Sequence, residues 1–269
     1  YEHILADCRR ILSPDHPDIF TFRDNLADAY RKAGELDRAT DLYEQNLDDR
    51  LRALGPDHPD TLISRNNLAG AYHESDRPDK AIPLFEHNLA SRERVLGPDH
   101  PDTLTSRNNL AGAYESADRL EQAIPLFEQT LTDTLRVLGP DHPHALAARG
   151  NLADAYWSAG KLDEAIDLYK QNLVETLRVL GPDHPRTLAS WGDLAYAHRS
   201  AGKLGDAIRL FEQALTDRER VLGPNHPDTR LFRKNLADAY RAVGRDEDAE
   251  ALLDPPPAFD DAEADRPDD

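Results

Sequence analysis

Six histidines, each followed by a proline, are the residues of this sequence best suited to chemistry. They recur every 42 residues, as His16, His58, His100, His142, His184 and His226. Imidazole binds transition metals and acts as a general base. Metal ligands must all lie about 2 Å from one ion, whereas equivalent residues of packed helical repeats lie on the order of 10 Å apart. The spacing therefore predicts no shared metal site.

The same histidines lie in a loop that suits the start of a helix. "LGPDHPDTL" occupies Leu54–Leu62 and returns at Leu96–Leu104, with near-copies in the other repeats. Proline favours the first helical position, where its missing N–H costs nothing. The Asp and His before it can cap the exposed N–H groups of that turn. We expect a structural role for the loop.

Other catalytic patterns are missing from the sequence. Gly160-Lys161 and Gly202-Lys203 resemble the end of a phosphate-binding loop, but the earlier glycine and the final hydroxyl are absent. No H-E-x-x-H, G-x-S-x-G or Cys-x-x-Cys pattern occurs. We expect no catalytic site, no metal and no cofactor within these residues.

The fixed period indicates a stacked repeat array. In such an array each repeat buries its apolar face against the neighbouring repeat. The repeats start at Pro14, Pro56, Pro98, Pro140, Pro182 and Pro224. Residues 1–13 are then the end of a truncated preceding repeat, and residues 14–253 are the array. Residues 254–269 form an acidic, proline-rich tail, for which composition predicts disorder.

Each repeat reads as two helices. In the third repeat, Leu104, Arg107, Leu110, Ala111 and Tyr114 share one helical face, which predicts a helix from about 101 to 117. A second apolar face begins at Leu120, after a break at Asp118 where four other repeats have glycine. Recurrent alanines predict close helix crossings, and recurrent Tyr or Phe predict core packing. Pro83 and Pro125 should kink the second helix or delay its start.

The pattern N-L-A-x-A-Y, then G-x-L-x-x-A, then Tyr or Phe, resembles the tetratricopeptide repeat (TPR). The 42-residue period and the "LGPDHP" loop resemble the subtype of kinesin light chains and of many bacterial multidomain proteins. The resemblance covers about residues 1–253 and implies an all-α fold, a right-handed α-solenoid of stacked antiparallel helix pairs. His198, where other repeats have tyrosine, departs from the pattern.

Charge and composition limit the classes of partner and the compartment that we expect for this protein. The formal charge is −19, which disfavours nucleic acid and favours neutral or basic protein segments. There is a single cysteine, so no internal disulfide forms, and a reducing compartment, the cytoplasm, is expected. No apolar run is long enough for a membrane span. Methionine is absent, so we expect the sequence to be a fragment.

The stripe opposite the buried face of the first helix is the expected binding surface, because the resemblance implies that it lines a concave groove for partner peptides. Asparagine recurs there as Asn25, Asn67, Asn109, Asn151 and Asn235, with Asn66 and Asn108 beside it. An asparagine amide can hydrogen-bond to both the N–H and the C=O of a peptide backbone. Alternatively, these amides bond to the neighbouring helix and order the stack; both roles are compatible.

Selectivity should come from the irregular fourth and fifth repeats. There Trp157 lies at the edge of the stripe, Tyr196 and Arg199 are added, and Asp193 replaces the asparagine. Trp191 falls on the buried side, in the core. Three functions remain open: a recognition or scaffold arm of a larger bacterial protein such as a signalling ATPase, a free-standing peptide-binding adaptor, or a structural or oligomerising spacer. The sequence leaves the oligomeric state open.

Overall fold

The computed structural model describes residue 3, residues 10–12 and residues 16–253, and these contain helices and no strands. The helices fall into two compact units, residues 1–159 and 160–269. The first unit holds α2 (Pro17–Lys32), α3 (Leu36–Leu54), α4 (Pro59–Glu74), α5 (Pro78–Leu96), α6 (Pro101–Ser116), α7 (Leu120–Leu138) and α8 (Pro143–Ser158). The second holds α9 (Leu162–Leu180), α10 (Pro185–Ser200), α11 (Leu204–Leu222), α12 (Pro227–Ala242) and α13 (Asp246–Leu253).

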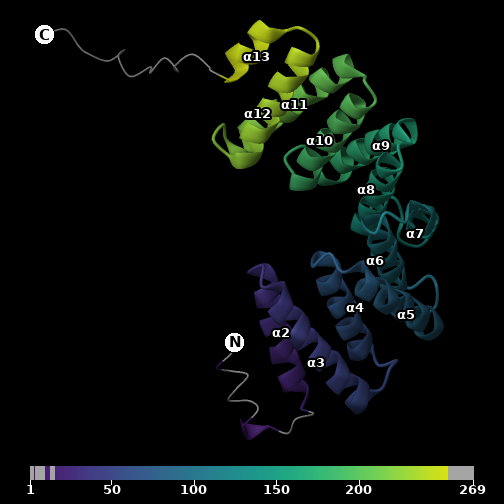
Figure 1. Cartoon of the computed structure of the whole chain (residues 1–269). Helices are drawn as coiled ribbons and strands as arrows, with labels where there is room; N and C mark the ends of the chain where they lie inside the picture. Colours follow the sequence, from purple (N-terminus) through teal and green to yellow (C-terminus); the bar gives the residue numbers. More distant parts are fainter. Residues whose placement is uncertain (1–2, 4–9, 13–15, 254–269) are drawn as a thin grey trace, which may run out of the picture. The chain divides into compact units, whose positions relative to one another are not determined.

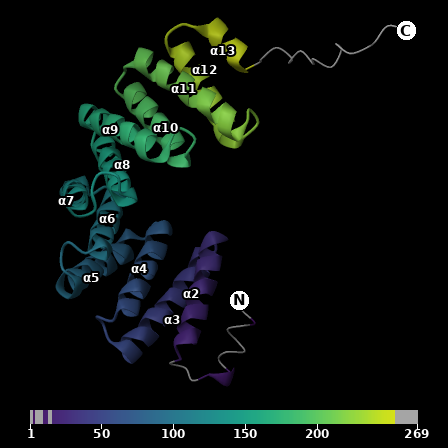
Figure 2. The ribbon, with the colours of Figure 1, turned by 180° about the vertical axis from the view of Figure 1, so that it is seen from behind.

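Within each unit, every helix packs on the next one along the chain (Figure 1). The first helices of successive repeats also touch, α4 with α6 and α6 with α8. Figure 2 shows the same succession of helices from behind. The predicted α-solenoid of helix pairs is confirmed, and the predicted helix of the third repeat is observed as Pro101–Ser116. The predicted end of a preceding repeat and the acidic tail lie largely or wholly outside the described residues.

The recurrent histidines are helix caps. In all six repeats, Nδ1 of the histidine accepts a hydrogen bond from the backbone N–H two residues later, at 3.1–3.2 Å, and proline occupies the first helical turn. The preceding aspartates have another task. Asp99 pairs with Arg136 and Asp183 with Arg220, each at the end of the following second helix. The loop is therefore a structural start signal, as its sequence predicted.

Residues in the left-handed region separate the two helices of each repeat. Gly34, Gly160, Gly202 and Gly244 have φ between 71° and 79°, and Asp76 and Asp118 take their place in the second and third repeats at φ 54° and 57°. Aspartate is among the few residues that tolerate this conformation. Pro83 and Pro125 do not delay their helices, which begin in the same register as those without proline. The expectation of a delayed start was wrong, because proline at the sixth helical position forfeits only one backbone hydrogen bond near the helix start. The kink stays a prediction.

The core includes the recurrent alanines and aromatic residues together with leucines and isoleucines. The alanines equivalent to Ala111 on the first helix and to Ala123 on the second are completely buried in every repeat. The large residues of the second helix, Tyr43, Phe85, Phe127, Tyr169 and Phe211, are at most 3% exposed. This confirms that the aromatic row is core. None of the described helices is both long and apolar enough to span a bilayer.

Tyrosine–glutamate hydrogen bonds tie four of the first helices, α4, α6, α8 and α12, to the preceding second helix. The hydroxyl of Tyr156 donates to Glu128 at 2.6 Å and that of Tyr240 donates to Glu212 at 2.7 Å; Tyr72–Glu44 and Tyr114–Glu86 are equivalent. Burial, and then the adjacent carboxylate, raise the pKa of Tyr72, Tyr114 and Tyr240 to about 12. In the fifth repeat both partners change, to His198 and Lys170.

A buried arginine provides a second link. Arg107 is 1% exposed, and its guanidinium contacts Asp133 at 2.8 Å and Glu93 at 3.2 Å. Arg23 bonds to Asp49 at 2.6 Å in the same way. The fifth repeat again differs, because Trp191 stands at this position. Trp191 is partly buried against the core cluster of the second unit, so its core assignment holds only in part.

The capping role of the histidines predicts the effect of a substitution. His58→Asn should lower the free energy of unfolding by less than about 1 kcal/mol, because asparagine also accepts a hydrogen bond from an N–H of the first turn. His58→Ala removes the acceptor and should cost more than His58→Asn. Urea denaturation followed by circular dichroism measures both.

Zinc provides the control for this interpretation. It should leave the melting temperature unchanged in the wild type and in His58→Asn. A metal-dependent rise in the wild type that disappears in the variant would contradict the capping role.

Candidate functional site

The candidate site in the first unit is the outward stripe of α4, α6 and α8. We call it the first-helix face and define it by Asn66, Asn67, Asn108, Asn109 and Asn151. All five side chains are half-buried. They stand between the alanine face, which packs against other helices, and open solvent. The face is therefore polar, partly ordered by its own contacts, and accessible.

The asparagines bond to one another across the stack. Nδ2 of Asn109 on α6 donates to Oδ1 of Asn66 on α4 at 3.0 Å, and Nδ2 of Asn151 on α8 donates to Oδ1 of Asn108 on α6 at 2.9 Å. The stack-ordering alternative therefore describes real contacts in this structure. The sequence showed both asparagine columns but not that they pair with each other.

Pairing leaves hydrogen-bonding capacity on the face. Each asparagine has one acceptor oxygen and two N–H donors, and each pair uses one donor of the first residue and one acceptor lone pair of the second. The amide oxygens of Asn109 and Asn151 and the NH₂ groups of Asn66 and Asn108 keep sites for a ligand. Order in the stack and ligand binding can thus use the same side chains.

The first repeat has a different arrangement at the position of the asparagine pairs. Asp24 of α2 stands where later repeats have Asn66 and Asn108, and it binds Nδ2 of Asn46 at 2.6 Å and the guanidinium of Arg50 at 2.8 Å. Burial raises the pKa of Asp24, although Arg50 opposes the shift. Asn25 is exposed, and Asn67 makes no side-chain hydrogen bond to another described residue. Asn67 is therefore the residue of the first-helix face whose side chain makes no hydrogen bond in the stack.

Trp157, at the end of α8, is the most exposed aromatic side chain of the described residues, at 43%. It belongs to the first unit. The other predicted selectivity residues, Asp193, Tyr196 and Arg199, belong to α10 in the second unit and are described there.

Tyr196 is more a packing residue than the sequence indicated. Its ring lies 5.3 Å from Phe211 and 5.8 Å from Phe232, its hydroxyl accepts from Nδ2 of Asn235 at 2.8 Å, and burial raises its pKa. The guanidinium of Arg199 lies 5.1 Å from the ring centre and is itself exposed. Asp193 is half-buried at the ladder position. Arg199 is thus the more available of the two predicted contacts.

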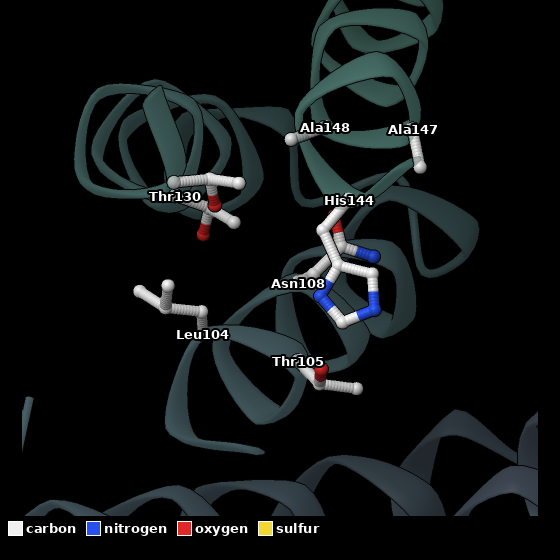
Figure 3. Close-up of a pocket in the computed structure, with 8 residues that line it drawn as sticks. Leu104, Thr105, Asn108, Thr130, His144, Ala147 and Ala148 are labelled. Carbon is white, nitrogen blue, oxygen red and sulfur yellow. The ribbon is translucent and has the colours of Figure 1, made fainter. Parts of the chain in front are cut away.

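A hollow of about 100 Å³ opens on the first-helix face between α6, α7 and α8. Figure 3 shows Leu104 and Thr130 facing His144 across it, with Ala148 from α8 at its edge. Asn108, an acceptor in the ladder, also lines it. The hollow therefore lies next to the asparagines that we expect to bind a ligand backbone.

Two replacements account for this hollow. One repeat earlier, between α5 and α6, Arg92 donates to Ser106 at 2.8 Å across the equivalent position. Here the corresponding residues are Thr134 and Ala148, which are shorter and cannot form that bond. The sequence analysis did not predict the hollow, because threonine and alanine are each common in helices and neither residue alone indicates a cavity. The available signal was the joint loss of Arg and Ser at two repeat positions.

The pair predicts how the hollow can be closed. Thr134→Arg together with Ala148→Ser should restore the bond made by Arg92 and Ser106, so the double variant should unfold at the wild-type denaturant midpoint or above. Thr134→Arg alone lacks the serine acceptor and should be less stable than the double variant by about 1 kcal/mol. Equal stability of the two variants would mean that serine does not receive the guanidinium.

No cluster of three or more His, Cys, Asp or Glu side chains in the described part of the chain is placed to hold a metal ion. The candidate site is therefore a surface of amides, threonines and one exposed tryptophan. Such a surface can bind a polypeptide through hydrogen bonds and packing.

Comparisons with known proteins agree with this fold. The family model described as tetratricopeptide repeat matches residues 18–93, 66–134, 119–173, 171–219 and 194–254. A search of the curated proteins finds no match.

Among solved structures, the nearly identical TPR-like repeats of a kinesin light chain from Podosopora anserina share 31% identity, with a TM-score of 0.68 over 76% of this chain and 97% of that one. BtubC (BKLC) from P. vanneervenii shares 21%, with a TM-score of 0.69 over 81% and 88%. A Rap protein complexed with Competence and Sporulation Factor shares 12%, with a TM-score of 0.62 over 93% and 77%. With its helix pairs, alanine crossings and matched repeats, the chain belongs to the tetratricopeptide repeat family.

Proposed function

We propose that the first-helix face binds an extended segment of a partner protein, and that the chain is a non-catalytic recognition or scaffold arm of a larger cytoplasmic protein. The observation that carries the proposal is the paired asparagine ladder, which retains donors and acceptors after ordering the stack. Free amide groups held on rigid helices suit a ligand backbone, since little entropy is lost when they bind.

The spacing of the ladder fits an extended chain. Successive repeats place equivalent asparagines on the order of 10 Å apart, and an extended strand advances about 3.3 Å per residue. One repeat thus corresponds to about three ligand residues. A backbone-directed ladder of this kind holds a strand without reading its side chains, so sequence preference must come from the irregular positions.

Charge on the face favours a basic segment. Glu115 on α6 and Asp154 on α8 interact, and burial and then Asp154 raise the pKa of Glu115. The hydroxyl of Ser158 donates to Glu115 at 3.2 Å. A lysine or arginine of the ligand would relieve this repulsion, whereas phosphate groups of a nucleic acid would add to it. The formal charge of −19 acts in the same direction, though salt screens it beyond about 10 Å at 0.1 M.

The similar Rap protein was solved in complex with Competence and Sporulation Factor. At 12% identity that likeness supports the fold alone, so the binding proposal stands on the residues of this chain. A free-standing adaptor would use the same face. A structural or oligomerising spacer would not, and binding measurements separate it from both.

The first test uses two variants that barely disturb the stack. A peptide array identifies segments that bind the wild type, and fluorescence anisotropy then measures their affinities. Trp157→Ala should weaken the preferred segments by at least about 1 kcal/mol, as truncation of an exposed aromatic anchor does. Asn67→Ala should weaken all segments alike, because it contacts backbone and makes no stack bond.

Circular dichroism must show wild-type helicity for each variant. Val137→Ala on the second helix α7 is the matched control for an exposed apolar residue and should bind normally. If both variants keep full affinity while folded, the face is not the binding surface and the spacer function replaces the proposal.

The pKa of Glu115 predicts a pH dependence. Its carboxylate attracts a basic ligand only when charged, so affinity for an arginine-containing peptide from the array should be full at neutral pH. It should fall as the pH drops through the raised pKa, which lies above the ordinary glutamate value of 4.5. Because the folded form binds this proton more tightly than the unfolded form, protonation of Glu115 does not itself unfold the protein.

Anisotropy titrations across this range measure the effect. Glu115→Gln should remove the pH dependence, whereas Glu121→Gln, an exposed residue of α7, should keep it. A pH profile that is unchanged in Glu115→Gln would assign the effect to another group.

A further inference from the structure

The second unit contains a larger hollow, of about 510 Å³, between α9, α10 and α11. Leu173, Leu177, Leu194, Leu210 and Trp191 provide most of its apolar wall. None of the predicted binding residues of α10 lines it, so it is separate from the first-helix face. Its size lies within the range of about 300–1,000 Å³ of small-molecule sites, which are also mainly apolar with a few polar groups.

A paired replacement explains why the hollow is there. At the other steps of the stack, a tyrosine on the first helix reaches a glutamate on the preceding second helix, as Tyr240 reaches Glu212. Here the two positions are His198 and Lys170, and both line the hollow. The exchange replaces the phenol ring with the smaller imidazole, and it removes the hydroxyl and the carboxylate that accepted from it. It also places a cation where the other repeats have an anion.

The polar side chains around the hollow are incompletely paired. Nε1 of Trp191 and Nδ1 of His198 are buried and have no hydrogen-bond partner in the structure; the carboxylate of Asp206 is 3.7 Å from His198 and is engaged by Arg209. Lys170, at the rim, forms no ion pair within the described residues. The exposed ammonium group of Lys170 can donate to an acceptor that a ligand supplies.

We propose that this hollow binds a small organic carboxylate with an apolar body. The leucines cover the body, and the carboxylate oxygens accept from the ammonium group of Lys170. Asp167 at the rim repels further negative charge, which favours a ligand with a single carboxylate over a polyanion. The hollow shares no residue with the proposed protein-binding surface, so the two proposals stand or fall separately.

Trp191 reports on the site directly. The chain has two tryptophans, so Trp157→Phe leaves Trp191 as the sole indole. In that background, 4-phenylbutyrate should produce a saturable change in Trp191 emission. 4-Phenylbutylamine, which has the same apolar body and the opposite charge, should bind at least tenfold more weakly.

Two variants of the same protein test the assignment. His198→Tyr with Lys170→Glu installs the pair used at the other steps of the stack, so it should fold normally and weaken phenylbutyrate binding at least tenfold. Lys170→Gln changes only an exposed side chain and should abolish the preference for the carboxylate over the amine. The proposal is overturned if phenylbutyrate gives no saturable signal at millimolar concentration, or if Lys170→Gln keeps the preference. It is also overturned if the folded double variant binds as well as the parent.

Discussion

Close approach of helices at alanine is the constraint on which the rest of the structure depends. The alanines equivalent to Ala111 and Ala123 are fully buried in every repeat, and the distance between packed helix axes is set by the side chains at their contact. With a methyl group at each crossing, long side chains on either side can reach the neighbouring helix. The Tyr156–Glu128 bond and the Arg107–Asp133 pair both require that reach.

The bridges between helices also decide where the molecule is hollow. Where arginine and serine, or tyrosine and glutamate, face each other, the space between helices is filled. Where both members change together, as at Thr134 with Ala148 and at His198 with Lys170, a hollow opens. The alanine crossings beside both hollows are as fully buried as those of the other repeats. Specific sites thus arise where substitutions interrupt a regular pattern of paired side chains.

The sequence predicted the helices closely because the repeat period, the proline starts and the left-handed breaks are local signals. It could not decide what the asparagines do, since the partner of Asn109 is Asn66, 43 residues earlier, on another helix. It also placed Tyr196 on the surface stripe, whereas the ring packs against Phe211 and Phe232. That packing depends on Gly192, where a Cβ would lie only 2.6 Å from the Phe232 ring. Such contacts combine residues far apart in sequence, and periodicity within one helix does not reveal them.

The bonds described between helices join residues of the same repeat or of the next one, such as Asn109 to Asn66 or Arg136 to Asp99. A block of 42 residues that begins and ends at equivalent glycines therefore carries one partner of each bond to the repeat before it. It also carries one partner of each bond to the repeat after it. Duplication of such a block in the gene would create a new layer whose contacts are already satisfied, and its deletion would let the flanking layers join. The array can lengthen or shorten by whole repeats without redesign of its core, and its surface then changes in steps of one layer.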